Sequence, residues 1–102
     1  MAVTAMKEGL GMPGEALGRI LAEYEPSVAV FVDDLGHQHD SVGELFPQVW
    51  RLHFVGEPLL WDRVNPSKAA HARLDRWPDA ELWIRERLVK NEPAPALEKA
   101  ST

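Results

Sequence analysis

The chain of 102 residues is long enough for one domain with a hydrophobic core, and its formal net charge is −5 at pH 7. Binding to a nucleic-acid backbone requires a clustered basic surface, which such an acidic chain lacks. We therefore expect no nucleic-acid partner. It has no cysteine, which excludes disulfides, thiolate nucleophiles and cysteine-ligated metals and is compatible with the cytoplasm, the location we predict. No stretch approaches the ~20 apolar residues that cross a bilayer, and no cleavable signal is recognisable, so we expect no membrane partner.

The chain divides into three parts by composition. Residues 1–12 are predicted to be a flexible leader, and residues 13–90 to fold. Residues 91–102 contain two prolines and several small residues, and this tail is predicted to be disordered. The fold begins with a helix from Pro13 that Pro26 terminates, because proline suits a first helical turn and breaks a helix interior.

A β-branched apolar run at residues 28–32 predicts a central strand, buried on both faces. A polar turn at residues 34–40 follows it. The later predicted elements are, in order, a short helix at 41–46, a strand at 49–56, a loop at 57–67 with one helical turn at 59–63, a strand at 70–74 and a helix at 79–90.

Strands that alternate with helices predict a parallel sheet with right-handed crossovers. The predicted fold class is therefore α/β, a small three-layer sandwich with about three parallel strands and helices on the sheet, similar to half of a Rossmann-like domain.

Two adjacent carboxylates, Asp33 and Asp34, follow the central strand directly. Ligands of open α/β sheets bind at the carboxyl ends of the strands, where these side chains would project. Neighbouring carboxylates repel each other and suit a hard cation such as Mg²⁺, so the pair is a candidate metal site. The alternative is structural, because aspartate also forms turns by capping nearby backbone amides.

This motif carries a family resemblance, because the segment from about Pro13 to Leu88 resembles the C-terminal half of a haloacid dehalogenase-like (HAD) hydrolase domain. The fourth motif of that superfamily is an apolar strand ending in two acids, then a turn, a polar residue and small residues. The matching residues here are Val28 to Val32, Asp33, Asp34, Gln38, Ser41 and Val42. The resemblance implies that the two acids help to hold Mg²⁺ against a substrate phosphate. Gln38, and His37 at the mouth of the crevice, are the candidate substrate-binding residues.

Two essential charges of that family are missing from this chain. No Asp-x-Asp triplet, which would supply nucleophile and general acid, occurs anywhere, and Met12 and Pro13 stand where the family has a lysine. We therefore expect no hydrolysis by the chain alone. In the family the missing strand lies beside the strand matched here. Residues 28–33 would then form an open sheet edge, which favours a homodimer or a complementary chain unless residues 1–12 or a loop cover it.

Histidines near the acid pair raise a transition-metal alternative. Asp33, Asp34, His37, His39 and Asp40 crowd into eight positions, but neighbouring loop residues seldom reach one ion and no HExxH helix supports them. The plainer interpretation makes His37 and His39 solvated turn residues. We predict structural roles for the two histidines of the later strand regions, His53 and His71.

A protein-interaction module that binds a partner through the open sheet edge at residues 28–33 or through exposed tryptophans is the alternative function. Trp61 and Leu60, in a proline-containing loop, are the candidate partner surface, because tryptophan is frequent among binding hot spots. A third reading is an enzyme of unfamiliar mechanism that uses Asp33, Asp34 and His37.

Overall fold

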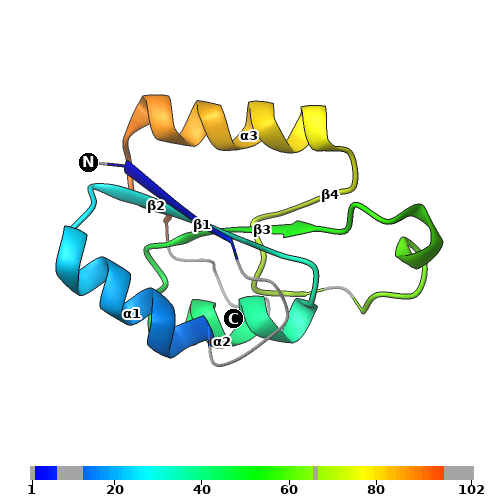
Figure 1. The fold of residues 1–102 in the computed structure, drawn as a ribbon, viewed down its shortest axis with the longest axis horizontal. Coiled ribbons are helices and arrows are strands. Elements are labelled where there is room, and N and C mark those ends of the chain that lie inside the picture. Colours follow the sequence, from blue (N-terminus) through cyan, green and yellow to red (C-terminus); the bar gives the residue numbers. More distant parts are fainter. Residues whose placement is uncertain (1, 7–12, 66, 96–102) are drawn as a thin grey trace.

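Parallel strands and helices alternate along the chain (Figure 1). The computed structural model describes residues 2–6, 13–65 and 67–95. The elements are, in order, β1 (Ala2–Met6), α1 (Pro13–Tyr24), β2 (Val28–Asp33), α2 (Gly36–Leu45), β3 (Trp50–Phe54), the 3₁₀ turn η1 (Pro58–Leu60), β4 (Ala72–Leu74) and α3 (Trp77–Lys90).

The described strands form a four-stranded, all-parallel sheet in the order β1-β2-β3-β4. Each crossover through a helix moves one strand in the same direction, so right-handed connections bring α1 and α2 to the same face. Figure 1 shows these two helices below the sheet and α3 above it. The predicted three-layer α/β fold is confirmed, with one more strand than expected. No helix of the described residues is long and apolar enough to span a membrane.

β2 divides the hydrophobic core between the two faces of the sheet. Its side chains alternate, so Ala29 and Phe31 pack toward α1 and α2 whereas Val30 and Val32 pack toward α3. The first cluster is completed by Leu17, Val42 and Val49, and the second by Leu52 and Ala80. Burial on both faces explains why β2 is apolar throughout until Asp33.

β1 is the strand that the sequence does not predict. It covers residues 2–6 of the expected leader and pairs with β2 from Ala2 opposite Val28 to Met6 opposite Val32. β2 therefore has a hydrogen-bonded neighbour on each side. The open edge predicted at residues 28–33 does not exist in this structure, so a dimer or a complementary chain cannot pair there while β1 is in place. The rest of the leader, residues 7–12, lies outside the described residues.

α2 begins five residues earlier than the sequence predicts. The polar positions 36–40 form its first turns rather than a loop, because Gly36, His39 and Val42 recur every third residue and are all buried. The buried His39 occupies a core-facing position that the sequence pattern assigns to an apolar residue. The turn between β2 and α2 consequently shrinks to Asp34 and Leu35.

The first residues of the predicted disordered tail are anchored to the sheet. The N–H of Ala94, which is buried, donates to the carbonyl oxygen of Gln48 at 2.8 Å. The indole Nε1–H of Trp50 donates to the carbonyl oxygen of Glu92 at 2.9 Å. Residues 91–95 thus close over the start of β3, whereas residues 96–102 lie outside the described part.

A buried arginine ties β3 to the segment before β4. Arg51 donates from Nε to the carbonyl oxygen of Ala69 at 2.7 Å and from a terminal nitrogen to that of Val49 at 3.0 Å. Its backbone N–H donates to Nδ1 of His71 at 3.0 Å. Burial, followed by the charge of Arg51, lowers the pKa of His71 to about 4, so His71 is a neutral acceptor at pH 7. The structural role predicted for His71 is confirmed.

The substitution Leu52→Ala tests the core beneath α3. Leu52 is fully buried in the middle of β3, so we expect its truncation to lower the free energy of unfolding by about 2–5 kcal/mol. Leu59→Ala is the matched control, because Leu59 is 79% exposed and should change stability by less than ~0.5 kcal/mol. Urea unfolding followed by circular dichroism measures both. Equal losses in the two variants would contradict this account of the core.

Candidate functional site

The acid pair lies at the carboxyl edge of the sheet, at the end of an inner strand. Asp33 is the last residue of β2 and only 3% exposed, whereas Asp34 is exposed. Because neighbouring strands are parallel, their carboxyl ends share this edge, and Asp33 is in register with His53 of β3. The residue Asp33 is thus buried, whereas its neighbour Asp34 is exposed to solvent.

The side chain of Asp33 also shapes the turn into α2. Its Oδ1 accepts the backbone N–H of Leu35 at 2.8 Å, the pattern by which an aspartate caps a turn two residues on. The first residues of α2 follow at once, so the start of this helix adjoins the carboxyl edge. Helix N-termini favour negative charge, since their first N–H groups have no partner within the helix.

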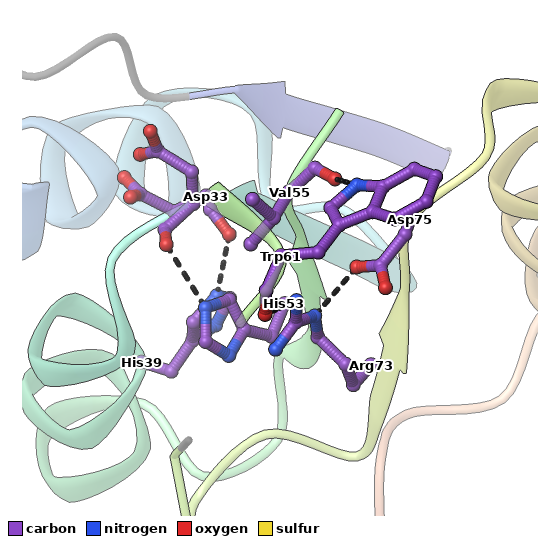
Figure 2. Close-up of polar contacts among 8 residues, drawn as sticks. Asp33, His39, His53, Val55, Trp61, Arg73 and Asp75 are labelled. Atoms are coloured by element: carbon purple, nitrogen blue, oxygen red, sulfur yellow. Dashed lines mark hydrogen bonds and ion pairs between the residues drawn. The ribbon is translucent and has the colours of Figure 1, made fainter. Parts of the chain in front are cut away.

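Two buried histidines hold the backbone of the acid pair. Nε2 of His39, on α2, lies 3.0 Å from the carbonyl oxygen of Asp33, and Nε2 of His53, on β3, lies 2.9 Å from that of Asp34 (Figure 2). A carbonyl oxygen only accepts hydrogen bonds, so each Nε2 carries a hydrogen and donates it. The consecutive peptide units after β2 are therefore fixed by two different elements.

His39 is a neutral core residue. It is fully buried, and its ring packs edge-on against Phe31 with 5.2 Å between ring centroids. Burial is the main reason why its pKa falls to about 4. With Nε2–H donated to Asp33, Nδ1 is the unprotonated nitrogen, and it has no hydrogen-bond partner among the described residues. The prediction that His39 is a solvated turn residue is wrong, whereas the structural role predicted for His53 is confirmed by its burial and its hydrogen bond.

A second hydrogen-bonded group fastens the loop after β3. The indole Nε1–H of Trp61 donates to the carbonyl oxygen of Val55 at 2.7 Å (Figure 2). Arg73 of β4 donates to the carbonyl oxygen of Trp61 at 3.0 Å and pairs with Asp75 at 2.6 Å. Trp61 is therefore tied to the sheet although 36% exposed. Leu60 of the predicted partner surface is 41% exposed, so part of that surface is accessible.

The predicted substrate-binding residues both lie in the first turn of α2. His37 is exposed and Gln38 is half-buried, and the backbone N–H of Gln38 donates to the carbonyl oxygen of Leu35 at 3.1 Å. They share the carboxyl edge with the acid pair, and their substrate contacts stay a prediction. Within the described residues, no group of three or more histidine or acidic side chains is arranged to hold a metal ion, so the five-residue transition-metal alternative gains no geometric support.

No protein-family model matches this chain, and no curated protein or solved structure matches it either.

The substitution His39→Phe tests whether the histidine that donates to Asp33 is neutral and buried. The pKa of His39 is about 4 in the folded protein and near 6.5 in the unfolded chain. Below pH 6.5 the unfolded chain therefore binds a proton that the folded state does not. The free energy of unfolding is greatest above pH 6.5 and decreases as the pH falls toward 4, by about 3 kcal/mol from this residue.

Urea unfolding at pH 7 and pH 4.5 measures this effect. We expect His39→Phe to lose less stability on acidification than the wild type, because it lacks the titrating group. His37→Phe is the matched control, since His37 is exposed, and it should keep the wild-type pH dependence. The same pH dependence in wild type and His39→Phe would refute a neutral His39 in the core.

Proposed function

We propose that this chain is a partial haloacid dehalogenase-like domain, in which Asp33 and Asp34 provide a weak Mg²⁺ site. In this proposal the chain does not hydrolyse phosphate esters alone. The main support is the pairing of a buried and an exposed carboxylate at the carboxyl edge of an inner parallel strand, with both backbone carbonyls fixed by buried histidines. Sites of α/β proteins form at this edge.

The chemistry of the two side chains suits Mg²⁺ in part. This ion prefers oxygen ligands and commonly takes one or two carboxylates together with water and substrate phosphate. Asp34 is exposed and available, but Oδ1 of Asp33 already accepts the N–H of Leu35. No third acidic or histidine ligand completes a cluster within the described residues, so weak binding follows. When bound, Mg²⁺ would screen the negative charge of a phosphate group.

The neighbour of β2 explains why we expect no turnover. The resemblance requires a strand beside β2 that carries an Asp-x-Asp nucleophile motif. In this chain β1 pairs there, its sequence AVTAM contains no acid, and no Asp-x-Asp triplet occurs in the 102 residues. Phosphoryl transfer needs a positioned nucleophile together with charge neutralisation. An active site would therefore require a second chain that supplies both and takes the position of β1.

A protein-interaction module is the second candidate function, and exposed apolar residues favour it. Leu59, Leu60 and Trp61 form an accessible corner beyond β3, and α3 exposes Trp77, Leu82 and Val89. Such a module needs no metal, so Mg²⁺ separates the two functions.

Thermal unfolding with and without about 10 mM Mg²⁺, at matched ionic strength, tests the metal site, because this concentration is roughly fivefold above the Kd of a weak site with Kd on the order of 2 mM. A ligand that binds only the folded state stabilises it by RT ln(1 + [L]/Kd), which is about 1 kcal/mol when Mg²⁺ exceeds Kd fivefold. For a domain of this size that corresponds to a rise in Tm of roughly 4–8 °C. We expect Asp34→Asn to abolish the rise.

Glu23→Gln is the matched control. Glu23 is an exposed carboxylate near the C-terminal end of α1, so its loss should leave the Mg²⁺ response intact. An unchanged Tm in the wild type, or an equal shift in Asp34→Asn, would refute the metal site. Hydrolysis of an aryl phosphate by the wild type that Asp34→Asn lacks would refute the second part of the proposal, namely that the chain is inactive alone.

A further inference from the structure

α3 presents an apolar face that nothing in the described part of the chain covers. Trp77 is 48%, Leu82 59% and Val89 78% exposed. A groove of about 300 Å³ at Trp77 is lined by Trp77, Glu81, Ile84, Arg85 and Leu88. Toward the sheet, Ala80 is fully buried and Trp83 packs on the core, and Ile84 and Leu88 pack partly on the core at the boundary with this face.

The residues of this face are arranged symmetrically in sequence about position 83. Positions at equal separation before and after it carry complementary side chains. The pairs are Trp77 with Val89, Pro78 with Leu88, Glu81 with Arg85, and Leu82 with Ile84. At 100° per residue all eight fall within one half of the helix circumference. Every apolar residue is thus matched with an apolar residue, and the acid with the base.

We infer that α3 is a self-association surface, on which a second copy of this chain docks with its own α3 antiparallel. A two-fold interface is self-complementary, because residue i of one protomer meets residue j of the other and j meets i. An antiparallel pair of helices centred at position 83 puts Trp77 level with the partner's Val89 along the helix axis. It also puts Glu81 against the partner's Arg85, twice. The inference does not depend on the metal site.

Charge explains why a second copy fits this face. The chain has a net charge of −5, yet the face carries one acid and one base, so the face itself adds no repulsion between two copies. Within one protomer Arg85 pairs with Glu81 at 2.7 Å, and both side chains are more than half exposed. Such an exposed pair contributes little alone. Packing between two copies removes water around it and doubles the number of opposite charges in reach.

The size of the face sets the strength of the dimer. Stable interfaces bury about 800 Å² per partner, and one helix face of four turns offers less. We therefore expect reversible dimerisation, with Kd on the order of tens of micromolar or weaker.

Sedimentation equilibrium across a concentration series tests the inference. The wild type should shift from monomer to dimer as concentration rises. Glu81→Arg and Arg85→Glu should each remain monomeric, because each puts like charges opposite one another at two positions. An equimolar mixture of these two variants should form a heterodimer, since two bases on one chain then face two acids on the other. A fluorescent label on one variant detects that heterodimer.

Glu86→Arg and Lys90→Glu are the matched controls. Both residues lie on α3 outside the symmetric face, so these variants should dimerise as the wild type does. Circular dichroism establishes that every variant is folded. A wild type that stays monomeric throughout the series would overturn the inference. So would dimers that survive both charge reversals, or a mixture that forms no heterodimer.

Discussion

Two hydrogen bonds to consecutive carbonyl oxygens determine how the chain leaves β2. His39 donates to Asp33 and His53 to Asp34, from α2 and β3 respectively. An unpaired carbonyl buried at a strand end costs free energy, so both histidines contribute to stability as well as to geometry. The two fixed peptide units set the backbone positions from which the side chains of Asp33 and Asp34 extend. A site built on these acids is therefore only as rigid as the two imidazole rings that donate to its backbone.

The parallel sheet connects this corner to the rest of the fold. β1 and β3 flank β2 on its two sides, and the two hydrophobic clusters cover its two faces. Asp33 is the point at which this apolar strand becomes polar. A carboxylate at such a position is costly to bury unless hydrogen bonds or a cation compensate it. The N–H of Leu35 supplies one hydrogen bond, and a cation at Asp34 would add to the compensation.

Local sequence signals predict some elements well and others poorly. β2 is recognisable from its apolar β-branched run, and α3 from Pro78 and its acidic first turn, because these signals lie within the element. β1 is not, since only Val3 and Thr4 of its five residues favour a strand and its stability comes from pairing with residues far along the chain. The sequence predicts too late a start for α2, because His39 is a polar residue type at a position that is buried.

The candidate site likewise combines features that local sequence patterns predict with features that depend on distant residues. The acid pair stands out as two adjacent carboxylates after a strand, but the support from His53 depends on the register of β2 with β3, which no local pattern contains. His39 is different, because its spacing of three residues from Gly36 and from Val42 is a local pattern that indicates one buried helix face. The hydrogen bond from Trp61 to Val55 likewise depends on the path of a loop.

Paramagnetic broadening by Mn²⁺ in amide NMR spectra tests the central claim most directly, because Mn²⁺ shares the preference of Mg²⁺ for carboxylate and water ligands. At substoichiometric Mn²⁺ the account predicts selective loss of the amide signals of Asp34, Leu35 and Gly36, while Glu23 on α1 stays sharp. Uniform broadening over all acidic residues, or broadening centred on another carboxylate such as Asp62, would contradict a metal site at the end of β2.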